Sequence, residues 1–154
     1  MGNNNSTVVF VIAMVLLAAL AVGVQFFRTR RSPLGRVLRI FSNIKYDEKF
    51  CQDFNYSRSV GKFRTGAWEK TKEKVGFLPE DLRAELGRLF GIIADVNDRI
   101  EAAIHLKSNG YLAGIDVSKL QDPLAACREQ LQKWISANMH NPEYLPKRRS
   151  LFRW

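Results

Sequence analysis

The sequence is poor in the residues that build catalytic and metal sites. Its 154 residues include two histidines, His105 and His140, and two cysteines, Cys51 and Cys127, with no metal-binding spacing among them. No Walker A loop, dinucleotide-binding glycine motif, EF-hand or nucleophile elbow occurs. Because acid–base and nucleophilic catalysis need several convergent titratable groups, these absences leave enzymatic activity unsupported. We therefore expect a non-catalytic protein with no metal and no cofactor, and keep an enzyme with an unrecognised site as an alternative.

The titratable residues that do occur favour structural interpretations. Two cysteines are too few for a disulfide framework; Cys127 falls on an apolar helix face and is expected in the core, whereas Cys51 fits either a core or an exposed position. Asp95, Asp98 and Glu101 form an acidic row at helical spacing. Asparagine and arginine interleave with this row, so we interpret it as a solvated helix face and not as a metal site.

No charged side chain occurs in the first 27 residues. Residues 8–27 read VVFVIAMVLLAALAVGVQFF, in which Gln25 is the single polar side chain. As a helix this stretch is about 30 Å long, the thickness of a bilayer's hydrocarbon core. It therefore predicts one transmembrane helix, preceded by a short polar N-terminus at residues 1–7. A cleaved signal peptide is the competing interpretation, but the basic n-region that precedes such peptides is missing.

Basic residues begin directly after the predicted span. The positive-inside rule then places the N-terminus outside and the C-terminal domain in the cytoplasm or on a mitochondrial matrix side. The net charge of +9 divides into +5 over residues 28–49 and +4 over residues 147–154, while residues 50–146 are neutral. Such flanks around a neutral domain favour anionic lipid headgroups as a partner and disfavour nucleic acid. The arginines nearest the span, here termed the basic collar, are Arg28, Arg30, Arg31, Arg36 and Arg39.

Residues 28–49 predict a basic amphipathic helix. Ser32 and Pro33 are a favoured N-cap and first helical residue. An apolar stripe at helical spacing follows, made of Leu34, Val37, Leu38, Phe41 and Ile44. This stripe either lies along the headgroups or packs into the soluble domain.

Residues 50–141 predict a small helical domain. Aromatic and basic residues alternate up to Phe77, a pattern typical of core residues with solvated neighbours and, less often, of a nucleic-acid surface. Two longer helices follow, at 79–109 and 123–139, and we expect them to form an antiparallel hairpin in which each covers the other's apolar stripe. A coiled-coil homo-oligomer is a variant of this arrangement. The expected helix-pairing seam consists of Leu82, Leu86, Leu89, Ile93, Val96, Ile100, Leu124, Cys127, Leu131 and Trp134.

A short C-terminal tail at 142–154 is basic and aromatic. We expect it to be disordered in the isolated protein, with a membrane interface or a partner protein as its alternative settings. Its candidate contact residues are Lys147, Arg148, Arg149, Phe152, Arg153 and Trp154.

These features together predict an all-α protein with a single N-terminal transmembrane helix followed by a small bundle. None of the motifs identifies a family. The function we expect is that of a membrane-anchored interaction or accessory protein, which tethers or stabilises a larger membrane assembly through other membrane-protein subunits. The alternative is a basic module that binds a membrane surface or nucleic acid.

Overall fold

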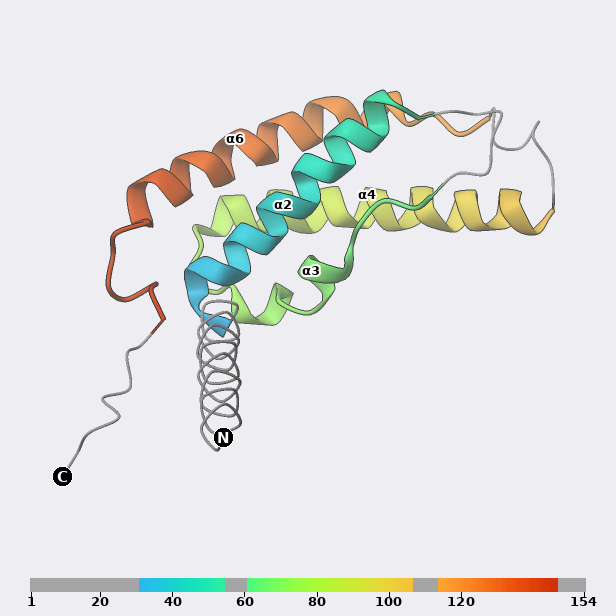
Figure 1. Cartoon of the computed structure of the whole chain (residues 1–154). Coiled ribbons are helices and arrows are strands. Elements are labelled where there is room, and N and C mark those ends of the chain that lie inside the picture. Colours follow the sequence, from blue (N-terminus) through green and yellow to red (C-terminus); the bar gives the residue numbers. More distant parts are fainter. Residues whose placement is uncertain (1–30, 55–60, 107–113, 147–154) are drawn as a thin grey trace, which may run out of the picture.

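A computed structural model describes residues 31–54, 61–106 and 114–146, and within these ranges every regular element is a helix. Three long helices dominate, and the connections between them contain shorter turns (Figure 1). The predicted all-α fold and helical bundle are confirmed for this part of the chain. The elements are α2 (Pro33–Gln52), α3 (Gly66–Glu69), η1 (Lys72–Lys74), α4 (Glu80–His105), η2 (Ser118–Leu120) and α6 (Gln121–Asn138).

The predicted transmembrane segment lies outside the described residues. So do residues 1–7, the first two arginines of the basic collar and the tail from 147 to 154. Among the helices within the described ranges, none is long and apolar enough to cross a bilayer.

Helix α2 begins where the sequence predicts. The Ser32 hydroxyl accepts a hydrogen bond from the Gly35 amide at 3.0 Å, and Pro33 occupies the first helical position. Proline is suited to that position because its missing N–H has no partner in a first helical turn. The helix continues to Gln52, three residues beyond the predicted boundary at 49.

The apolar face of α2 packs into the bundle. Val37, Ile40 and Ile44 are fully buried. Leu38, which the predicted stripe included, is 41 % exposed, whereas the omitted Ile40 takes an interior position. Successive helical residues are about 100° apart, so the buried face continues through positions three or four apart and leaves Leu38 beside it. Of the two settings predicted for this stripe, its burial supports packing into the bundle and not a position along the lipid headgroups.

The predicted seam of α4 is buried along its whole length, together with Phe90. In α6, Leu124, Cys127 and Leu131 are buried, but Trp134 is half-buried and Ile135 takes the interior position. Helix α6 packs more extensively against α2 than against α4. The expectation that the last two helices chiefly cover one another is therefore corrected: the aliphatic row of α2 is the main surface that α6 covers.

Two further helix boundaries, the end of α4 and the start of α6, differ from the prediction. Helix α4 starts directly after Pro79 but ends at His105, before the expected stop at 109. Helix α6 begins at Gln121, because η2 leads directly into it, and no side chain caps its start. Asp122 and Pro123 consequently lie inside the first turn, where a proline costs no hydrogen bond.

The segment between α2 and α4 covers the rest of the α4 stripe. Its turns are short, as predicted, and they bring Phe63, Trp68, Val75 and Leu78 into the core. The Trp68 ring stacks on Phe90 of α4 at 5.4 Å between centroids. The described aromatic residues of this region thus contribute largely to packing.

Candidate functional site

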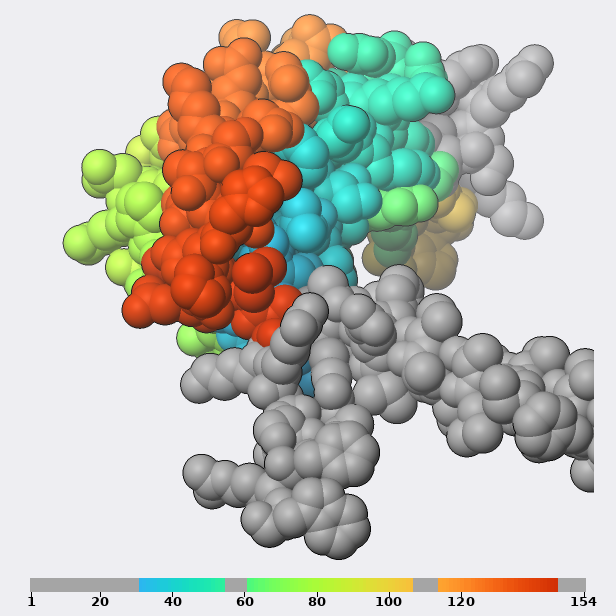
Figure 2. Space-filling view, turned by 60° about the vertical axis from the view of Figure 1, so that its left-hand side comes forward, coloured from blue at the N-terminus to red at the C-terminus, as the bar shows by residue number. Residues whose placement is uncertain are grey.

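The chain returns to the start of α2 after α6 ends. A compact turn follows α6, in which the Tyr144 amide donates to the Asn141 carbonyl at 3.1 Å and the Glu143 amide donates to the Asn141 side chain at 3.0 Å. The Tyr144 carbonyl then accepts a hydrogen bond from the Leu34 amide at 3.1 Å. The last described residue, Pro146, therefore lies near the point where the bundle begins. Figure 2 shows the red surface of this C-terminal segment adjoining the blue and cyan surface of α2.

This contact contributes to the cap of α2. The first four N–H groups of a helix have no partner inside it. Here Pro33 has no N–H, and the Gly35 amide uses the Ser32 hydroxyl, whereas the Arg36 amide already makes the first helical bond, to the Ser32 carbonyl. The Leu34 amide has no partner inside the helix, and the Tyr144 carbonyl satisfies it. The C-terminal segment is thus a structural part of the N-terminal end of the bundle.

Three aromatic rings hold the same segment in place. Tyr144 lies 5.2 Å from Trp134 and 5.6 Å from Phe77, measured between ring centroids, and Phe77 and Trp134 are themselves 5.6 Å apart. Such pairs contribute about 0.5–1.5 kcal/mol each beyond the area that they bury. Trp134, expected in the helix seam, instead contributes to this cluster. We call the four residues Leu34, Phe77, Trp134 and Tyr144 the terminal clasp.

The described arginines of the basic collar occupy three different environments. Arg31 is exposed. Arg36 is half-buried, and its Nη1 donates to the Lys74 carbonyl at 3.1 Å. Arg39 is half-buried as well, and its buried Nε has no hydrogen-bond partner among the described residues. The first and second arginines of the collar, at 28 and 30, lie outside the described ranges.

The contact made by Arg36 places Lys74 at the end of the bundle that carries the terminal clasp. The Lys74 side chain is exposed and adds a positive charge near the start of α2. Sequence reasoning missed this residue, because the two positions are 38 residues apart and no local pattern connects them.

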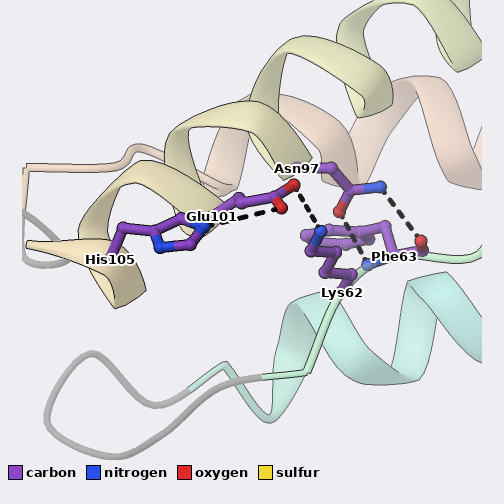
Figure 3. Close-up of polar contacts among 5 residues, drawn as sticks. All are labelled: Lys62, Phe63, Asn97, Glu101 and His105. Carbon is purple, nitrogen blue, oxygen red and sulfur yellow. Dashed lines mark hydrogen bonds and ion pairs between the residues drawn. The ribbon is translucent and has the colours of Figure 1, made fainter.

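A second polar feature joins α2 to α4. The non-helical backbone at 62–64 passes between these helices, and side chains from both hold it; we call this segment the strap. The Asn97 side chain accepts from the Phe63 amide at 2.9 Å and donates to the Phe63 carbonyl at 3.0 Å, as Figure 3 shows. Lys62 pairs with Glu101 at 2.6 Å, and His105 lies 3.9 Å from the same carboxylate. Glu101 is exposed, as the predicted solvated row requires, and it also pairs with the strap.

From the α2 side, a buried carboxyl group holds the strap. Asp47 is 0 % exposed, and its Oδ1 accepts from the Arg64 amide at 2.7 Å. Its buried Oδ2 has no hydrogen-bond partner among the described residues. Burial raises the pKa of Asp47 from 3.8 to about 7, although the Arg64 amide and guanidinium oppose that rise. The one available sequence signal was its phase: Asp47 follows Ile44 by three residues and precedes Cys51 by four, on the buried face.

Neither cysteine is placed for nucleophilic chemistry. Both thiols are free and buried, and the Cys51 thiol donates to the Val117 carbonyl at 3.1 Å. Burial, with a smaller effect from the Asp47 charge, raises the pKa of Cys51. Burial, helped by Glu85, raises the pKa of Cys127 to about 11. Since the thiolate is the reactive form, both side chains behave as core residues.

The described residues contain no cluster of histidine, cysteine and acidic side chains able to hold a metal ion. The structure instead shows two candidate features. The terminal clasp lies at the start of α2, near Arg31 and Lys74, and the strap lies between α2 and α4. No protein-family model, curated protein or solved structure matches this chain.

Proposed function

We propose that this protein is a single-pass membrane-anchored helical protein that tethers or stabilises a larger membrane assembly without catalysis. One observation carries the proposal: the buried core begins at Leu34, only seven residues after the end of the apolar run at Phe27. Seven residues extend at most about 25 Å. A span at 8–27 would therefore hold the bundle close to the bilayer, on the cytoplasmic or matrix side according to the charge asymmetry.

The polar groups of the strap and the terminal clasp serve to hold the fold together, which fits a tethering role. The strap and the terminal clasp use their polar atoms to fix backbone segments, and the two thiols are buried. Apolar side chains that remain partly exposed occur on α2 and α4, where Leu38, Ile92 and Ile104 are each more than 40 % exposed. These positions offer contact area to other membrane-protein subunits or to a second copy of the chain.

The second candidate function is a basic module that binds a membrane surface or nucleic acid. Of its two forms, the lipid form has the better support. Sequence-tolerant binding of single strands uses aromatic side chains as stacking platforms. Phe54, Phe63 and Trp68 are instead buried in the core, and the guanidinium of Arg64 covers Tyr46 at 3.5 Å from its ring centroid.

The first test is extraction of the tagged full-length chain in a gentle detergent, followed by native separation and mass spectrometry. We expect it to migrate with a larger membrane assembly and to remain there at moderate salt. A variant with Arg148 and Arg149 changed to Gln serves as the control, because it removes basic charge far in sequence from the predicted span and leaves the arginines that set its orientation in place. Migration alone, or with lipid or nucleic acid that salt removes, would replace the tethering role with the basic module.

A further inference from the structure

We infer that the strap is a proton-controlled latch: it stays closed on α2 while Asp47 carries a proton, and it opens locally when that carboxyl group is ionised. The opening is distinct from unfolding of the bundle, because it releases residues 62–64 and leaves the three long helices packed. The inference rests on contacts between described residues and does not depend on the proposed membrane anchor.

The closed strap is held by a small number of hydrogen bonds from side chains. On the α2 side, the Arg64 amide donates to Asp47 Oδ1 at 2.7 Å, and the Arg64 carbonyl accepts from Asn43 Nδ2 at 3.3 Å. On the α4 side, the Asn97 amide group bonds both the N–H and the carbonyl of Phe63 (Figure 3). A segment held in this way opens by breaking few bonds, whereas a turn inside a long helix opens together with its neighbours.

The Phe63 ring favours the closed position. Phe63 is 3 % exposed, and its ring centroid lies 4.8 Å from that of Phe50 and 6.4 Å from that of Phe54. Opening would bring this ring into water, and the hydrophobic cost of doing so is the same at every moderate pH. The ring therefore closes the strap, and any proton dependence must come from another group.

Asp47 supplies the proton dependence. Asp47 is 0 % exposed, and its Oδ2 has no hydrogen-bond partner among the described residues. A carboxylate that is buried beside one amide donor loses more hydration than it regains. Burial accordingly raises the pKa of Asp47 to about 7 while the strap is closed, and the pKa returns towards 3.8 once water reaches the group. Ionisation of Asp47 therefore favours the open strap.

The charged groups on the strap and on α2 oppose this effect only in part. The Arg64 amide and guanidinium favour the carboxylate, but burial outweighs both. The Cys51 thiol lies one turn further along α2, and burial and the Asp47 charge raise its pKa, so it stays neutral. Other elements that pack against α2 carry ion pairs, namely Arg128 with Glu48, Lys72 with Glu69, and Lys119 with Asp116.

From α4, one neutral and two titratable side chains lie at the strap. Asn97 is neutral and contacts the strap directly. Glu101 pairs with Lys62 at 2.6 Å and lies 3.9 Å from His105 (Figure 3). These three groups are exposed, so water screens their charges. The histidine is nevertheless the group that a control must remove, because histidine titrates near neutral pH.

Native-state hydrogen exchange of the detergent-solubilised full chain tests the latch at the Phe63 and Arg64 amides. After division by the intrinsic exchange rate, protection of the Arg64 amide should fall about tenfold for each pH unit between about 5 and about 7, and then level off. Exchange at these two amides should hardly depend on low concentrations of urea, because a local opening exposes little surface. The amides of Leu89 and Ile93 in α4 should depend on urea strongly.

Two variants assign the proton. Asp47→Asn keeps an oxygen that can accept from the Arg64 amide, and the protection of that amide should no longer depend on pH. His105→Gln is the control and should keep the full pH dependence of the original protein.

Three results would overturn the inference. The first is a pH dependence that persists in Asp47→Asn, and the second is one that disappears in His105→Gln. The third is equal protection and equal urea dependence at Arg64 and Ile93 in the original protein, because the strap would then open only when the whole bundle unfolds. This last comparison needs no variant, so it stands even if a substitution at the buried position prevents folding.

Discussion

The terminal clasp and the strap both fix a backbone segment with groups from distant parts of the chain, but their chemistry differs. In the clasp, a backbone carbonyl and three neutral aromatic rings hold the start of α2. In the strap, the fully buried carboxyl group of Asp47 holds the Arg64 amide from the second half of the same helix. One end of α2 therefore depends on a backbone hydrogen bond and ring packing, whereas the other depends on a buried carboxyl group whose pKa is raised to about 7.

The difference in chemistry predicts a difference in how the free energy of unfolding depends on pH. A neutral cap contributes about the same free energy at any moderate pH. A buried carboxylate is costly when charged, and its pKa links the stability of the fold to the proton concentration. The two regions are thus expected to respond differently to pH, to truncation and to salt.

The largest effect should come from the core that both regions share. Ile93 is fully buried on α4, so Ile93→Asp places an unpaired charge in the interior. We expect this variant to unfold the described bundle, with loss of near-ultraviolet circular dichroism and rapid proteolysis. Ile93→Val is the matched control and should cost only about 0.5–1.5 kcal/mol. A folded Ile93→Asp monomer that has merely lost an oligomer would show that the seam is an interface between copies.

The next effect is pH dependence at Asp47. Because folding raises its pKa from 3.8 to about 7, the folded chain binds this proton more tightly than the unfolded chain. Its contribution is therefore fully present below pH 3.8, declines between 3.8 and 7, and is lost above that range. The total change is at most about 4 kcal/mol. In Asp47→Asn, which retains an oxygen acceptor for the Arg64 amide, the decline should disappear.

Denaturation of the detergent-solubilised full chain at about pH 5 and about pH 8 measures this contribution as a difference between the two proteins. The comparison cancels the titration of all other groups. We expect Asp47→Asn to be the more stable protein at the higher pH. Equal pH profiles would mean that Asp47 is not the group that makes the strap sensitive to protons.

Asn97→Ala should have the third effect, by removing both side-chain hydrogen bonds to Phe63. An unsatisfied buried backbone group costs about 1–3 kcal/mol, so we expect a loss of about 2 kcal/mol. Urea denaturation at fixed pH measures it. The loss should be the same at acidic and alkaline pH, in contrast to that of Asp47. A pH-dependent loss would imply that the two sides of the strap are energetically coupled.

The elements of the bundle that could be predicted from sequence are those with local causes. Ser32 and Pro33 mark the start of α2, and the 3–4 spacing of apolar residues gives the buried row of α4, because caps and periodicity act within one or two turns. Periodicity identifies an apolar face but not its partner. The pairing of α6 with α2 was therefore missed, as was the position of Trp134 in the clasp.

The candidate sites were harder to predict, because they depend on contacts between distant positions. The Tyr144 carbonyl has no side-chain signature, so nothing in the sequence marks it as the cap of a helix 110 residues earlier. The phase of Asp47 along α2 indicates the buried face, but the sequence does not show that the Arg64 amide is its partner. The basic character of both flanks was visible, but the return of the chain from α6 to the start of α2 required the fold.

Tyr144→Ala should have a smaller, local effect at the clasp. It removes the ring contacts to Phe77 and Trp134 and leaves the backbone carbonyl in place, so we expect a loss of about 1–2 kcal/mol. Hydrogen exchange should accelerate at the Leu34 amide and remain unchanged at the Arg64 amide. Tyr144→Phe keeps the ring and should behave as the original protein. Faster exchange at both amides would show that the clasp and the strap open as one unit.

The smallest effect is expected for Lys62→Gln, at the solvent-exposed edge of the strap. Lys62 and Glu101 form the shortest ion pair of the described structure, at 2.6 Å, yet both side chains are about half exposed. Water and salt screen such a pair, and ordering two long side chains offsets the attraction. The midpoint of urea denaturation should therefore hardly change, in low or high salt. If Lys62→Gln were as damaging as Asn97→Ala, the charges would hold the strap. If Lys62→Gln has no effect, the amide of Asn97 and the buried carboxyl of Asp47 hold the strap, and high salt should leave it in place.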